Sequence, residues 1–193
     1  GRLMLNLDTE DWGEFYLGCA GGLDVNVARS AQAEPLASGG EGWRLVLSGL
    51  RGGHSGVDIH EERANAIKLM VRVLRSLEAA FPLHLSELRG GTARNALPRE
   101  AEASFVLPHG AGDRLAVAVA EFQETLRGEY RGVDDALHLA VAPCPIALTL
   151  PVAEQRVWLR SLHAAPHGVR RMSRQVPGVV ETSNNLGMVD LGP

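Results

Sequence analysis

The chain has few aromatic residues, a single lysine and two cysteines, and this composition restricts the kinds of protein to which it can belong. Phe, Trp and Tyr make up 5% of the 193 residues, so the apolar core has to be built from aliphatic side chains. Acidic and basic residues are interleaved at a net charge of −4, without the basic patch that a nucleic-acid-binding protein needs. No apolar run approaches the length of a membrane span. We therefore expect neither a nucleic acid nor a membrane as a partner.

The two cysteines, Cys19 and Cys144, are far apart and lack the spacing of a metal site. Reduced thiols are expected at both positions, and these fit a cytoplasmic protein. The chain begins at Gly1 without a methionine, and no signal peptide is visible. We therefore expect a fragment of a longer protein.

The hydrophobic pattern from Trp43 onward predicts a regular order of strands and helices. A helix is expected after Asp58, which with Glu61 forms a capping-box pattern, and a second helix is expected from Asp113. Alternating residues predict strands over 43–50, 83–88, 100–107 and 136–141. The order strand, helix, strand, strand, helix, strand is that of the split βαβ, ferredoxin-like plan, an α+β fold with two helices on one face of an antiparallel sheet.

The flanking segments carry further predicted elements. An apolar strand over 3–7 ends at the acidic residue Asp8, and a second strand is expected over 15–22. Residues 30–42 are expected to be a loop, and a third helix is expected from Pro151 to Ala165. One or two strands are expected within residues 179–191. Asp8 is either a site carboxylate at a strand end or part of an acidic turn.

Two glycine-rich segments present polar side chains. His54 lies in Gly-Gly-His-Ser-Gly, where it can donate a hydrogen bond, bind a metal or transfer a proton. Asn95 lies in Gly-Gly-Thr-Ala-Arg-Asn-Ala-Leu-Pro, where its amide can donate to a substrate carbonyl or carboxylate. For each residue taken alone, a histidine or asparagine on a surface turn is the simpler interpretation. The two segments together favour a functional site.

These segments, in this order, resemble the M20 metallopeptidases. The runs 13–22, 94–100 and 179–187 resemble one branch of that family, the bacterial aminoacyl-histidine dipeptidases, also called peptidase D or Xaa-His dipeptidases. The resemblance implies a hydrolase that cleaves small dipeptides with two zinc ions. It also implies residues 1–22 as a stub of an α/β catalytic domain and residues 23–193 as a lid or dimerisation domain, with a homodimer formed through the lid.

The resemblance also implies a role for each site residue. Asp8 matches a zinc-ligating aspartate, His54 matches the lid histidine that stabilises the oxyanion, and Asn95 matches a lid residue that contacts the substrate. In dimeric relatives the lid histidine comes from the partner subunit. The other metal ligands and the general base of the family have no match in the chain, so we expect this fragment alone to be inactive. Two alternatives are a non-catalytic ferredoxin-like module that dimerises or binds a small molecule, and a relative that has lost its metal site.

Overall fold

The structure, a computed structural model, describes residues 12–14, 21–36 and 40–193. The strand predicted over 3–7, together with Asp8 and Cys19, lies outside the described residues, as does most of the strand predicted over 15–22. Residues 21–33 are extended without a regular element.

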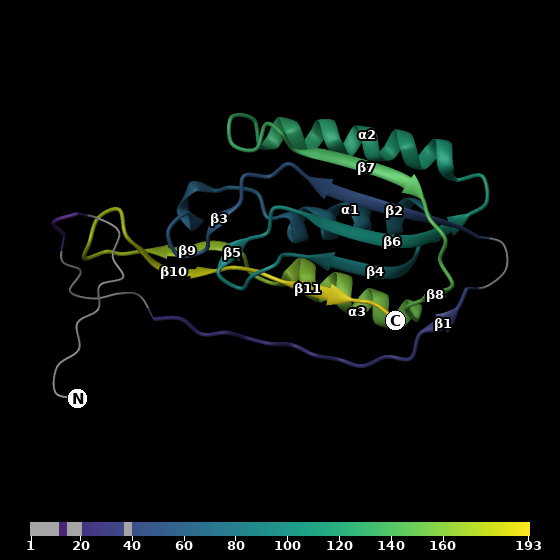
Figure 1. The fold of residues 1–193 in the computed structure, drawn as a ribbon, viewed down its shortest axis with the longest axis horizontal. Coiled ribbons are helices and arrows are strands. Elements are labelled where there is room, and N and C mark those ends of the chain that lie inside the picture. The colour runs from purple at the N-terminus through teal and green to yellow at the C-terminus, as the bar shows by residue number, and fades with distance from the viewer. Residues whose placement is uncertain (1–11, 15–20, 37–39) are drawn as a thin grey trace.

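The central feature is an antiparallel sheet of five strands in the spatial order β11-β4-β6-β2-β7 (Figure 1). Its strands are β2 (Gly40–Ser48), β4 (His84–Gly90), β6 (Ala101–Pro108), β7 (His138–Pro143) and β11 (Val189–Leu191). The loop predicted over residues 30–42 is wrong at two places, because the short strand β1 (Glu34–Pro35) lies within it and β2 begins at Gly40. The pairing of Gly40 with Pro108 shows why β2 begins there, because β2 is extended to match the full length of β6.

Three helices cover one face of this sheet: α1 (Ala66–Ala80), α2 (Gly112–Glu129) and α3 (Val152–Ala164). Burial alternates along β2, where Leu45 and Leu47 are fully buried and Val46 between them is half-buried. α1 lies between α2 and α3, and α2 lies along the edge strand β7 (Figure 1). The core is aliphatic apart from Phe105 and Phe81, as the composition predicts.

The first predicted helix is present, but its start was placed wrongly. Asp58 makes no side-chain cap and precedes only a short 3-10 helix, η1 (Ile59–Glu61). α1 begins eight residues after Asp58 and is capped by Asn65, whose side chain accepts a hydrogen bond from the backbone N–H of Lys68 at 3.1 Å. The side chain of Asp58 is instead used inside the loop that carries His54.

Three small two-stranded sheets surround the core. β3 (Gly53–His54) pairs with β5 (Ala96–Leu97), β1 (Glu34–Pro35) with β8 (Leu148–Thr149), and β9 (Gly168–Met172) with β10 (Val180–Asn184). The β9–β10 hairpin extends from one end of the domain, next to the β3–β5 pair (Figure 1). β9 has no counterpart among the predicted elements, whereas β10 and β11 are the two strands expected in the tail.

The chain is thus a mixed α+β domain with antiparallel sheets and three helices, as the sequence predicts at that level. Of the described helices, none is long and apolar enough to cross a membrane. Cys144 is a free, half-buried thiol, and burial raises its pKa.

Candidate functional site

The two predicted lid residues lie side by side at the β3–β5 pair: His54 is on β3, and Asn95 comes directly before β5. His54 is paired with Ala96 in antiparallel register, so it lies next to Asn95. The backbone N–H of Ser55 donates to the backbone oxygen of Asn95 at 2.8 Å. Both side chains are exposed. Segments separated by about forty residues in sequence therefore form one polar surface at the end of the domain.

The imidazole of His54 is oriented by its own loop. Its Nδ1 atom accepts hydrogen bonds from the backbone N–H groups of Gly56 and Val57, at 3.1 and 3.2 Å. An atom that accepts two N–H groups carries the lone pair, so this arrangement assigns the ring proton to Nε2. A neutral histidine with a protonated Nε2 can donate one hydrogen bond to an oxygen outside the loop.

A buried carboxylate closes the base of this loop. Asp134 is 1% exposed, and its two oxygens accept from the backbone N–H groups of Arg51 and Ala64, at 2.7 and 2.8 Å. The two ends of the loop are therefore joined through a residue that lies in a distant part of the sequence. Within the loop, the backbone N–H of His54 donates to Oδ2 of Asp58 at 2.7 Å.

The loop that carries Asn95 is fixed from the opposite side. Nδ2 of Asn185 donates to the backbone oxygens of Arg94 and Ala96, at 3.1 and 2.8 Å, and so spans Asn95. Both of these partners are acceptors, which fixes the orientation of the amide. Its Oδ1 atom is buried and has no hydrogen-bond partner among the described residues.

A second contact also fixes this loop, because the backbones of Gly91 and Gly187 lie close together. Gly91 has φ +73°, and a Cβ atom at this position would collide with the backbone oxygen of Gly187. Only glycine accommodates both the conformation and the contact. The segment after β10 thus holds the Asn95 loop at two points, Asn185 and Gly187.

The N-terminus of α1 joins the same segment to the core. Nδ2 of Asn65 donates to Nδ1 of His167 at 3.1 Å and to the backbone oxygen of Leu186 at 2.9 Å. Burial and the nearby charge of Lys68 lower the pKa of His167 to about 4, so this imidazole is neutral at physiological pH. A neutral His167 can accept the amide proton of Asn65.

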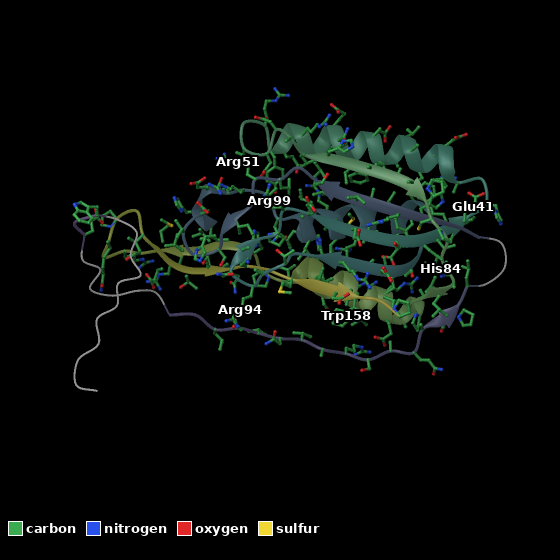
Figure 2. All side chains as sticks on the ribbon, viewed as in Figure 1. Glu41, Arg51, His84, Arg94, Arg99 and Trp158 are labelled. Atoms are coloured by element: carbon green, nitrogen blue, oxygen red, sulfur yellow. The ribbon has the colours of Figure 1, made fainter. Side chains whose placement is uncertain are left out.

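The extended segment before β1 passes close to the Asn95 loop. Arg94 forms an ion pair with Asp24 at 2.8 Å, and Figure 2 shows Arg94 on the side of the domain that faces this segment. A groove of about 420 Å³ lies between the segment, α3 and β11, where Trp158 and Met188 contribute apolar surface. Neither His54 nor Asn95 lines this groove, so we place the site at the exposed β3–β5 pair rather than in the groove.

Of the three residues proposed from the sequence, the structure brings two together. His54 and Asn95 are neighbours, whereas Asp8 lies outside the described residues. In the described ranges no group of three or more His, Cys, Asp or Glu side chains could hold a metal ion. These ranges therefore provide no metal centre by themselves.

Two supporting residues, Arg63 and Asp134, were not identified from the sequence as parts of the site. For Asn185, the polar run 181–185 leaves two interpretations, a segment that lines the cleft or a polar turn. Asp134 is far in sequence from both of its partners. The contacts of Arg63 and Asp134 follow from the tertiary fold, so no local pattern marks these two residues.

Comparisons with known proteins agree with this architecture. Residues 46–134 match the family model for the peptidase dimerisation domain of the M20 peptidases. This range contains β3, α1, β4, β5, β6 and α2, and thus both predicted lid residues.

Two known proteins are similar over longer stretches. The cytosol non-specific dipeptidase of Escherichia coli (strain K12) is 39% identical over 190 residues, which is 98% of this chain and 39% of that protein. The crystal structure of an aminoacylhistidine dipeptidase from Vibrio alginolyticus is 39% identical, with a TM-score of 0.78, over 81% of this chain and 32% of that one. The chain thus spans 39% of the length of the curated relative that it matches.

Proposed function

Because this chain is an M20 peptidase homologue and carries the family's dimerisation domain, we propose that it is part of a zinc-dependent dipeptidase. The substrates are small unblocked dipeptides, Xaa-His among them, as the names of the two relatives suggest. Residues 1–22 are the stub of the catalytic domain, residues 23–193 are the lid, and the enzyme is cytoplasmic. The observation that carries this proposal is the pairing of His54 with the Asn95 loop.

His54 supplies the donor that stabilises negative charge in the reaction. Attack on a peptide carbonyl develops charge on its oxygen, and a donor fixed in advance lowers the energy of that state. The Nε2–H of His54 is such a donor, because the contacts of Nδ1 hold the ring in one orientation. Removing one donor of this kind costs about 10²–10³ in kcat.

Asn95 binds the substrate beside this donor. Its side chain is exposed, and the bond from Ser55 to its backbone oxygen fixes its distance from His54. An amide can donate to a substrate carbonyl or carboxylate and accept from a substrate amine. The two residues therefore act on neighbouring parts of one small ligand.

The family relationship is the reason to expect zinc in the full-length enzyme. Zinc ions in such a hydrolase activate water and polarise the scissile carbonyl. Asp8 is the single ligand that we propose from this chain. The other ligands would come from segments of the longer protein.

The lid also forms a homodimer, as the name of its domain family suggests. Among the described strands, the edge strand β7 pairs with β2 alone, and α2 runs along this edge (Figure 1). An open strand edge pairs readily with a second copy of itself. The strand order β4-β6-β2-β7 is that of the ferredoxin-like plan, and it leaves this edge open.

A hydrolysis assay tests the proposal on two proteins, this chain and the product of the full open reading frame that contains it. Each is incubated with zinc and an Xaa-His dipeptide. The proposal predicts hydrolysis by the longer protein and none by this chain. Activity in neither would favour a non-catalytic dimerisation or small-molecule-binding module, and activity in this chain alone would place the site elsewhere.

A further inference from the structure

We propose that Arg63 is a positioning residue that holds the His54 loop in the geometry needed to present the Nε2–H of His54. The proposal rests on the function proposed above for His54. Arg63 does not contact the substrate in this account. Its role is to fix the backbone from which the imidazole projects.

The guanidinium of Arg63 connects both sides of the loop. Its NH1 group donates to the backbone oxygen of Gly52 at 2.6 Å, and its NH2 group donates to Oδ1 of Asp58 at 3.3 Å. The other oxygen of Asp58 accepts the backbone N–H of His54 at 2.7 Å. His54 is therefore held between two residues that Arg63 contacts directly.

The arginine is well placed for this role because it is mostly buried. Its side chain is 13% exposed, and its Nε and NH2 groups also donate to Oε2 of Glu61, at 2.9 and 2.5 Å. Partly buried, charge-assisted hydrogen bonds are stronger than exposed ones and have a fixed geometry. A planar guanidinium can serve Gly52 and Asp58 at once, which a lysine ammonium cannot do with the same geometry.

The backbone around the guanidinium is shaped to admit it. A Cβ atom on Gly53 would collide with NH1 of Arg63 and would lie 2.5 Å from Oδ2 of Asp58. Glu62, directly before Arg63, has φ +55°, which is a strained conformation for a residue other than glycine. Such strain persists only where the surroundings hold it, and it is common near functional sites.

The orientation of the imidazole follows from this backbone. The N–H groups of Gly56 and Val57 converge on Nδ1 of His54 only while the turn from 54 to 58 keeps its shape. That turn is closed by the backbone bond from the N–H of Asp58 to the oxygen of His54 at 2.8 Å. If the Asp58 carboxylate loses Arg63, the turn loosens, and the ring proton is no longer confined to Nε2.

The first test measures the tautomer of His54 in this chain without any activity assay. Long-range ¹H–¹⁵N spectra distinguish a protonated Nε2 from a protonated Nδ1. The unchanged protein should show the Nε2–H form, and Arg63→Met should show exchange between the two forms. Glu61→Gln is the matched control, because it removes an ion pair of Arg63 but leaves Gly52 and Asp58 bound, and it should keep the Nε2–H form.

A conservative variant and a second position keep the test decisive. Arg63→Lys keeps the charge without the planar geometry, so it should restore the Nε2–H form only in part. If Arg63→Met does not fold, Asp58→Asn takes its place, since an amide has one acceptor oxygen for the two donors. A folded Arg63→Met or Asp58→Asn protein with an unchanged Nε2–H signal would overturn the proposal.

The second test measures kcat and KM in the product of the full open reading frame. A donor displaced by about 1 Å costs on the order of 10²-fold in rate, so Arg63→Met should lower kcat by about that factor and change KM little. If His54→Ala lowers kcat but Arg63→Met does not, the Arg63 proposal alone fails. If His54→Ala leaves kcat unchanged while Arg63→Met still shifts the tautomer, the function proposed for His54 fails and the positional role of Arg63 stands.

Discussion

The backbone N–H of Ser55 donates to the backbone oxygen of Asn95 at 2.8 Å. This one bond joins the residue after the proposed oxyanion donor to the proposed substrate ligand. Because the bond lies between backbone atoms, it survives most side-chain substitutions and sets the spacing of the site. The supports on either side of it, Arg63 and Asn185, then determine how rigid the site is.

Asn185→Ala should loosen the site without disturbing the core. It removes two hydrogen bonds to the Asn95 loop, at about 1 kcal/mol of net stability each. Hydrogen exchange at the N–H of Ser55 should become faster, while exchange within the central sheet stays the same. The control is Asn184→Ala, which changes an exposed neighbour. Equal exchange at Ser55 in both variants would contradict the role given to Asn185.

Gly91→Ala should be more destabilising than Gly110→Ala. Both glycines have a left-handed conformation, with φ +73° and +75°, so both substitutions cost about 1–2 kcal/mol of backbone strain. Only at Gly91 does the new methyl group also meet a backbone oxygen, that of Gly187. Urea unfolding of the two variants measures the difference. If the two losses are the same, the close approach between the segments does not contribute to stability.

Much of the fold could be predicted from the sequence because its signals are periodic. Apolar residues at helical spacing in α1 and alternation in the strands follow directly from which side of each element is buried. The start of α1 was predicted wrongly because Asp58 and Glu61 match a capping box, but tertiary contacts recruit both side chains to Arg63. β9 has no predicted counterpart because burial does not alternate along it, and its pairing with β10 is irregular in register.

The site was predictable only in its exposed members. Histidine and asparagine between glycines stand out in a sequence, and the resemblance gave them roles. The residues that hold them do not stand out, because the role of a buried aspartate or arginine depends on partners that are distant in the sequence. Asp134 is the clearest case, since its carboxylate accepts hydrogen bonds from the backbone N–H groups of Arg51 and Ala64, which are far from it in the sequence.

Stability should fall as the pH decreases from about 6.5 towards 4, with a contribution from His167. Its folded pKa, about 4, is lower than the ordinary value of 6.5, so between these values the unfolded chain binds the additional proton. The loss is fully developed below pH 4 and amounts to about 2 kcal/mol once partial exposure is considered. Urea midpoints across this range should depend less on pH in His167→Gln. A His84→Gln control, at an exposed strand position, should keep the original dependence, and equal slopes in the two variants would contradict the assignment.

Val117→Arg should weaken the proposed homodimer. Val117 is 59% exposed on α2, the helix that runs along the open edge strand β7. A charge buried in an interface without a partner costs several kcal/mol, so we expect the dimer to dissociate at micromolar concentration. Sedimentation velocity measures this, with Val157→Arg on α3 as the matched control, since Val157 is 43% exposed. A dimer that Val157→Arg disrupts and Val117→Arg does not would place the interface on α3.

The most direct test of the central claim is the kcat of His54→Ala in the product of the full open reading frame, with zinc and an Xaa-His dipeptide. The control is His60→Ala, an exposed histidine six residues further along the same loop. If His54 is the oxyanion donor, its removal should lower kcat by about 10²–10³-fold, and His60→Ala should have the activity of the unchanged enzyme. A kcat that is the same in His54→Ala as in the unchanged enzyme would contradict the role of this chain in catalysis.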